Sequence, residues 1–159
     1  MTGVQTCALP ISIRNPKASR PWQHVIEPLF GYLTLAEKLY LNKKYIGAWN
    51  FGPNSRNNLQ VRNVANYGKK LLKSKSKISI KKNKFYESKH LALDSSKSSK
   101  YLKWRTLLNA KEAIRLTLDW YKFYYNKSLK KKIIEFTFYQ INKYKNKILL
   151  DRKSTRLNF

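Results

Sequence analysis

The chain has 159 residues, of which 34 are Lys or Arg and 8 are Asp or Glu, so its formal net charge is +26. This length leaves room for one domain, and 42% apolar residues are enough to bury a core. No stretch approaches the roughly 18 apolar residues that a membrane span needs, so we exclude a membrane protein and expect a cytoplasmic one.

The positive charge comes from 26 lysines and only 8 arginines, beside 14 asparagines. Enrichment in Lys and Asn is typical of an AT-rich coding sequence, in which lysine fills exposed positions. The densest basic stretch, residues 69–84, has eight lysines and no acid, and it contains no aromatic residue on which single-stranded bases could stack. We therefore expect only weak, non-specific and salt-sensitive attraction to nucleic acid.

The first predicted elements are an extended segment over residues 13–19 and a helix over 27–43. Pro28 suits the first helical position, where its missing N–H costs nothing. Apolar residues at helical spacing predict that one face of this helix is buried. The members of that face are Ile26, Leu29, Phe30, Leu33, Ala36 and Tyr40.

The middle of the chain alternates short strands and helices. Residues 48–52 read as a strand, 59–73 as a helix and 78–80 as a strand with period-two alternation. Asp94 or Ser95 can cap a short helix that ends near Tyr101.

Two longer helices are expected at the end of the chain. Asn109 and Glu112 have the spacing of a capping box for a helix over 110–126, and a further helix covers about 130–148. The chain therefore reads as a mainly helical α/β piece with two or three short strands.

Arg20 precedes the first long helix by a few residues and alternates with Trp22 and His24, as side chains on one strand face do. A guanidinium fork beside the positive end of a helix dipole suits an anionic ligand. For His24 a buried, hydrogen-bonded structural role is favoured over catalysis.

The string Ile13-Arg-Asn-Pro-x-Ala-x-Arg-Pro-Trp-Gln-His-Val-x-Glu-Pro-Leu-x-Gly-Tyr-Leu33 resembles the C-terminal half of extended short-chain dehydrogenase/reductase (SDR) enzymes that act on nucleotide sugars. Within that NAD-dependent epimerase/dehydratase family, it resembles the CDP-glucose 4,6-dehydratases more closely. Weaker matches follow in the family's order over residues 13–145. They are Ala36–Leu39, Ala48–Pro53, Leu91–Asp94 with Ser96 and Lys97, Leu102–Trp104, and Glu112 with Thr117, Trp120 and Tyr121.

The resemblance implies the substrate-binding, C-terminal half of a Rossmann-type enzyme, over residues 13–150. The intact enzyme would be a lyase that converts CDP-glucose to CDP-4-keto-6-deoxyglucose with bound NAD, in surface-polysaccharide biosynthesis. Its partners would be the nucleotide-sugar substrate and a missing N-terminal cofactor domain.

The resemblance also implies the binding residues. Arg20 corresponds to the family arginine that grips the nucleotide diphosphate, and Asn54 to an asparagine near it. Lys89 and His90 align where relatives often have Arg or His-Tyr, and lysine would meet a phosphate as a point charge without a fork. Arg14 would orient the nucleotide, with a structural role at the strand end equally open.

The catalytic and cofactor residues of the family have no counterpart here. Glycines stand only at 3, 31, 47, 52 and 68, so no glycine-rich dinucleotide turn exists. The family's acid/base pair, Tyr-x-x-x-Lys, occurs twice, at Tyr40 and at Tyr139, which is the number that chance gives. Two distant histidines and Cys7 predict no metal site. We expect a segment that binds no NAD and is inactive alone.

Both ends differ from that family. Residues 1–12 and 151–159 resemble translated sequencing-adapter sequence, so we expect them to lie outside the fold.

Three alternative functions stay open. The chain could belong to a dehydratase or epimerase of dTDP- or UDP-sugars, it could be a basic nucleic-acid-binding module, or it could be a helical scaffold without a ligand.

Overall fold

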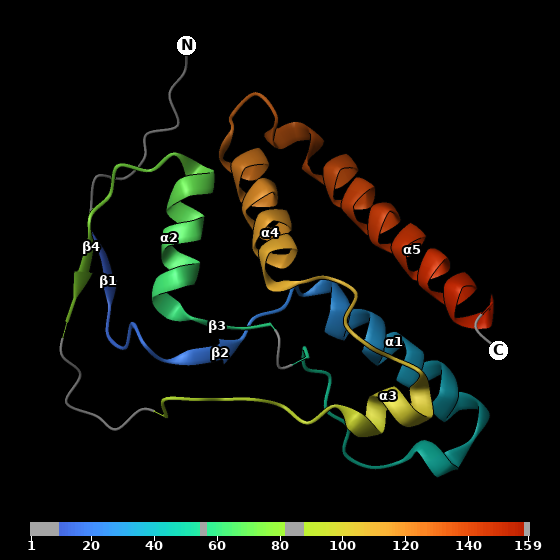
Figure 1. Ribbon diagram of the computed structural model, residues 1–159. Coiled ribbons are helices and arrows are strands. Elements are labelled where there is room, and N and C mark those ends of the chain that lie inside the picture. Colours follow the sequence, from blue (N-terminus) through green and yellow to red (C-terminus); the bar gives the residue numbers. More distant parts are fainter. Residues whose placement is uncertain (1–9, 55–56, 82–87, 158–159) are drawn as a thin grey trace. The chain divides into compact units, whose positions relative to one another are not determined.

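The computed structural model describes residues 10–54, 57–81 and 88–157. The chain forms two compact units, Met1–Leu118 and Asp119–Phe159. Within the described residues it is mixed α/β and mainly helical, with four short strands (Figure 1). The expected mixed and mainly helical class is therefore confirmed, with four strands among the described residues where two or three were predicted.

The strands of the first unit form two separate pairs. β1 (Ile11–Ile13) pairs in parallel with β4 (Ile78–Ile80). Residues 11 and 12, which were expected to lie outside the fold, therefore belong to a strand. β2 (Ser19–Pro21) pairs antiparallel with β3 (Asn58–Gln60). The strand expected at residues 48–52 is absent there, because Trp49 and Phe51 serve the core as part of a loop.

Helix α1 (Ile26–Leu41) begins earlier than predicted, with Val25 as its N-cap residue. Pro28 therefore lies in the first turn but not at the first helical position, and its missing N–H is still harmless there. The helix ends at Asn42, which has extended backbone geometry. Asn42 then caps the short 3-10 helix η1 (Lys43–Tyr45), where its side chain accepts a hydrogen bond from the Lys44 N–H at 2.9 Å.

The predicted burial of α1 is right for Phe30, which packs against the apolar core, and wrong for other members of the expected face. Leu29, Leu33 and Tyr40 of the expected core face are 50%, 71% and 92% exposed, whereas Glu27 and Gly31 are buried. Helical periodicity could not choose between the two sides, because both sides of this helix carry apolar residues.

The apolar core of the first unit lies between α1, the loop that contains Phe51, and the end of the helix Ser96–Leu102. Phe51, Leu102 and Trp104 form its buried cluster, and the rings of Phe51 and Trp104 meet edge to face at 5.0 Å between centroids. Gly31 lets the Phe51 ring approach the α1 backbone, since an added Cβ would collide with that ring.

A buried carboxyl group joins α1 to a distant loop. Glu27 is completely buried, and its Oε1 accepts hydrogen bonds from the backbone N–H of Leu107 at 2.6 Å and of Leu108 at 3.0 Å. The Glu27 carbonyl also accepts a bond from the Trp104 indole N–H at 3.1 Å. One side chain thereby satisfies backbone donors some 80 residues away.

Two further helices complete this unit. α2 (Val61–Leu72) ends at Lys73, and α3 (Ser96–Leu102) ends at Lys103, both of which adopt left-handed geometry. Asp94 accepts a hydrogen bond from the Ser96 N–H at 2.9 Å, and this bond lowers the pKa of the Asp94 carboxyl.

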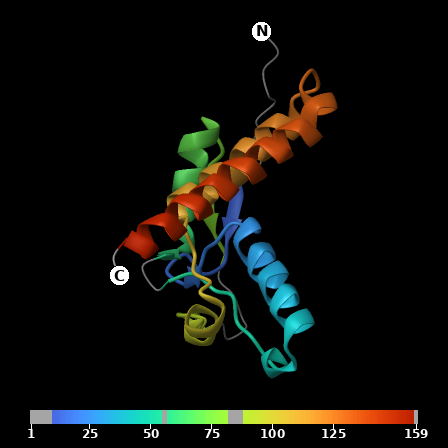
Figure 2. The same cartoon turned by 90° about the vertical axis from the view of Figure 1, so that its right-hand side faces the viewer.

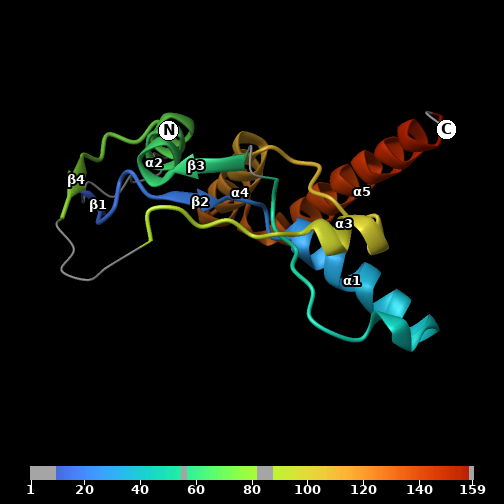
Figure 3. The same ribbon diagram turned by 60° about the horizontal axis from the view of Figure 1, so that its bottom comes forward.

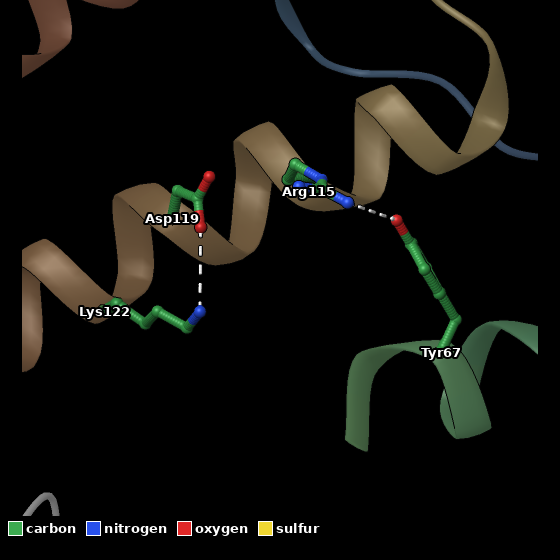
Figure 4. Close-up of polar contacts among 4 residues, drawn as sticks. All are labelled: Tyr67, Arg115, Asp119 and Lys122. Carbon is green, nitrogen blue, oxygen red and sulfur yellow. Dashed lines mark hydrogen bonds and ion pairs between the residues drawn. The ribbon is translucent and has the colours of Figure 1, made fainter. Parts of the chain in front are cut away.

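Helix α4 (Ala110–Tyr125) starts in the first unit with the predicted capping box, since Asn109 and Glu112 exchange bonds of 2.8 and 2.9 Å. In the first unit, Arg115 on α4 donates to the Tyr67 hydroxyl on α2 at 3.4 Å (Figure 4). In the second unit, Asp119 and Lys122 form an ion pair at 3.7 Å along the same helix (Figure 4).

The second unit joins the end of α4 to α5 (Ile133–Leu157) through the 3-10 helix η3 (Lys130–Lys132). The rings of Phe123 and Phe136 stack at 4.4 Å, and the Trp120 indole N–H donates to the Thr137 hydroxyl at 2.9 Å. Helix α5 extends well beyond the predicted end at residue 148 and runs through residues 151–157.

Candidate functional site

The candidate site lies along β2. Arg20 stands opposite Leu59 in the antiparallel pair of β2 with β3. The Trp22 indole N–H donates to the Leu59 carbonyl at 2.9 Å, which fixes the end of β2 against β3. The alternating strand predicted to reach His24 ends at Pro21, because Trp22 turns toward β3 instead.

Arg20 is half-buried, and its guanidinium is held by the backbone. Nη1 donates to the carbonyl of Ser19 at 2.9 Å and to the carbonyl of Ser88 at 3.0 Å. These bonds fix the direction of the guanidinium plane, and they tie the segment that starts at Ser88 to β2.

Residues 88–91 run beside β2 (Figure 3) and join it through one isolated bridge. The Ser19 N–H donates to the Lys89 carbonyl at 2.8 Å, the Leu91 N–H donates to the Ser19 carbonyl at 3.3 Å, and Ser19 and His90 form a parallel bridge. The structure therefore brings Lys89 and His90, both exposed, next to Arg20 across some 70 residues of sequence.

Arg20, Lys89 and His90 are thereby neighbours along the backbone of β2 and of residues 88–91, and we call these three residues the Arg20 cluster. Guanidinium and ammonium groups pair strongly with phosphate oxygens, and an imidazole N–H can donate to one. The arrangement suits a phosphate-bearing ligand.

The other two predicted binding residues lie elsewhere in the first unit. Arg14 is exposed just after the end of β1. Asn54 is exposed in the loop before β3, where its carbonyl accepts the Asn57 N–H at 2.8 Å.

Asn54 lines a cleft of about 230 Å³. The cleft combines a guanidinium, hydroxyl groups and an apolar wall, and none of Arg14, Arg20, Lys89 or His90 lines it. Sequence reasoning did not assign Arg105 to any site, although it directly follows the Trp104 that the family resemblance singled out. The lining residues are Gly52, Pro53, Asn54, Leu93, Ser95, Ser96, Ser99, Trp104, Arg105 and Thr106.

His24 has the structural role that the sequence favoured. It is buried, and its Nδ1 accepts a hydrogen bond from the Ile26 N–H at 3.2 Å at the start of α1. Burial lowers the pKa of the imidazole from its ordinary 6.5. A neutral ring fits the acceptor role of Nδ1.

The described glycines do not fit the phosphate turn of a dinucleotide. Gly31 faces the Phe51 ring and Gly52 faces the Leu93 side chain, so neither offers backbone to a ligand. Gly68 lies inside α2, and Gly47 with φ +128° stands alone after η1. Such a turn needs closely spaced glycines at a helix start, and the described glycines are not arranged in that way.

Neither a metal centre nor a membrane helix is found within residues 10–54, 57–81 and 88–157. No group of three or more His, Cys, Asp or Glu side chains could hold a metal ion there. No helix among those residues combines the length and the apolar character needed to cross a bilayer.

Comparison with known proteins finds a distant relative. The chain is 33% identical over 114 residues to CDP-glucose 4,6-dehydratase of Salmonella typhimurium, which is 70% of this chain and 32% of the relative. The chain thus spans about a third of the length of this curated relative, and the similarity indicates a distant relationship to the dehydratase. No protein-family model matches the sequence.

Proposed function

We propose that this chain is the nucleotide-sugar-binding segment of a dehydratase-like protein and that it holds the ligand by its diphosphate. The observation that carries the proposal is that backbone bonds make Arg20, Lys89 and His90 neighbours along β2 and residues 88–91, and the similarity to CDP-glucose 4,6-dehydratase supports it. CDP-glucose is the proposed ligand, and the intact protein would convert it to CDP-4-keto-6-deoxyglucose.

Within this proposal Arg20 has two functions. Its bond to the Ser88 carbonyl positions Lys89 and His90, and its fork faces the diphosphate. Lys89 adds a point charge. Chemistry on the sugar would belong to residues and a cofactor outside this chain, so the chain alone is proposed to bind without turnover.

Titration calorimetry of the full chain with CDP-glucose tests the proposal. A charged contact to phosphate contributes about 1.5–3 kcal/mol, so Arg20→Ala should weaken binding about ten- to hundred-fold. Arg20→Lys should recover part of the loss, because it restores charge without the fork. Arg115→Ala is the matched control, since that arginine bonds Tyr67 between α4 and α2, and it should leave binding unchanged.

Two comparisons separate ligand binding from a purely structural effect. The loss in Arg20→Ala should be larger for CDP than for CMP, because the fork acts on the diphosphate. The titration should run at about 0.15 M salt, where screening suppresses attraction between a +26 chain and any anion. Equal affinity of wild type and Arg20→Ala for CDP-glucose would refute the proposal, and preference for dTDP- or UDP-glucose would refute the CDP assignment.

A further inference from the structure

The turn between α4 and α5 carries a group of lysines that the proposed function does not use. We define the basic tip as Lys127, Lys130, Lys131 and Lys132, which lie on this turn and on η3 in the second unit (Figure 2). All four lysines are exposed, and residues 120–134 contain no Asp or Glu. Because no carboxylate offsets the lysines in this stretch of sequence, the basic tip attracts anions.

Exposed apolar side chains begin directly beside the basic tip. We define the α5 stripe as Ile134, Phe138 and Ile141, which recur at i, i+4 and i+7 and therefore share one side of the helix. They are 67%, 60% and 43% exposed in chain order. Leu129, which stands between the lysines of the tip, is also exposed. An apolar stripe that continues from a lysine cluster is typical of a helix that lies on a lipid surface, with its apolar side chains at the acyl boundary and its ammonium groups among the headgroups.

The aromatic rings near the tip are engaged with one another. The rings of Tyr124 and Trp120 stack at 5.3 Å between centroids, and the Lys130 Nζ lies 5.0 Å from the centroid of the Tyr124 ring. The rings of Phe123 and Phe136 stack in the same way. Proteins that hold single-stranded nucleic acid stack its bases on accessible ring faces. Engaged rings beside exposed aliphatic side chains and lysines therefore favour a lipid surface over nucleic acid.

We propose that the basic tip and the α5 stripe bind the surface of an anionic phospholipid bilayer. Each lysine close to such a surface strengthens binding about fivefold, and the apolar side chains add burial at the acyl boundary. Binding of this kind needs no helix that spans the bilayer, because the helix lies in the plane of the interface. The inference does not depend on the proposed function, since the Arg20 cluster belongs to the first unit and the tip to the second.

Co-sedimentation of the full chain with vesicles tests the proposal. At about 0.15 M salt, where long-range attraction is screened, the wild-type chain should bind vesicles of phosphatidylcholine with phosphatidylserine and should not bind vesicles of phosphatidylcholine alone. A tip variant that combines Lys127→Gln, Lys131→Gln and Lys132→Gln should weaken this binding about hundredfold. It leaves Lys130 in place over the Tyr124 ring.

The matched control removes the same charge from the other basic stretch. It combines Lys70→Gln, Lys75→Gln and Lys77→Gln, three exposed positions of the first unit. Both triple variants lower the net charge by the same amount, so any difference between them is local. The control should weaken vesicle binding by less than about fivefold, which is the effect of a single lysine at the surface.

A second pair of variants tests the apolar contribution. Ile134→Gln should weaken binding to the phosphatidylserine vesicles about tenfold, because an isoleucine side chain would no longer be buried at the interface. Ile46 is an isoleucine of the first unit that is 69% exposed, close to the 67% of Ile134. Ile46→Gln should leave vesicle binding unchanged.

Equal losses in the two triple variants would overturn the inference, and so would equal binding of the wild-type chain to both kinds of vesicle. Ile134→Gln that binds as tightly as wild type would also overturn it, because charge alone would then explain the attraction. Binding to DNA that is tighter than binding to phosphatidylserine vesicles, and that the tip variant loses, would assign the tip to nucleic acid and refute the lipid surface.

Discussion

Replacing Glu27 should reveal how much of the first unit depends on one buried carboxyl group. In Glu27→Ala the N–H groups of Leu107 and Leu108 lose their acceptor, and Leu108 is itself buried. A buried donor left unsatisfied costs about 1–3 kcal/mol. Since the Leu107 bond is only partly buried, we expect the free energy of unfolding to fall by about 2–5 kcal/mol.

Urea unfolding followed by tryptophan fluorescence measures this loss, because Trp104 bonds the Glu27 carbonyl. Glu27→Gln keeps an oxygen acceptor and nearly the same volume, so it should cost less than Glu27→Ala. Glu37→Ala is the matched control, since Glu37 is an exposed glutamate of the same helix, and it should change stability by less than about 0.5 kcal/mol. If Glu27→Ala and Glu37→Ala unfold at the same urea concentration, the Glu27 bonds do not stabilise the fold as argued.

Two further predictions concern packing and pH. Gly31→Ala should destabilise the chain by about 1–3 kcal/mol, because the new Cβ would collide with the Phe51 ring. Gly68 in α2 has room for a Cβ, so Gly68→Ala should stabilise the chain by about 0.5–1 kcal/mol. The urea midpoints of the two variants compare these effects, and equal effects would contradict the packing argument. Burial lowers the pKa of His24, so the unfolded chain binds more protons below pH 6.5 and stability should fall as the pH drops below that value, by at most about 1.4 kcal/mol per pH unit. His24→Gln should reduce this slope. Thermal unfolding between pH 7 and pH 5 measures it, and an unchanged slope in His24→Gln would contradict the reasoning.

Local rules predicted much of the secondary structure. The capping box of Asn109 and Glu112 starts α4 as expected, because its hydrogen bonds span only three residues. The strand at Ile78–Ile80 was predictable from its period-two alternation, and the burial of His24 from the residues that flank it in the sequence. The sequence likewise marked Arg20, Lys89 and His90, whose roles as ligand contacts remain predictions.

Tertiary structure alone decided which side of α1 is inside. The helix offers two apolar sides, and the inner one is chosen by contacts with Phe51, Leu107 and Leu108, none of which adjoins it in sequence. The backbone bonds that place Lys89 and His90 beside Arg20 likewise cross some 70 residues. Sequence periodicity shows how apolar residues are spaced along one helix or strand. Only the folded chain shows which distant hydrogen-bond donors, aromatic rings and strands that element contacts.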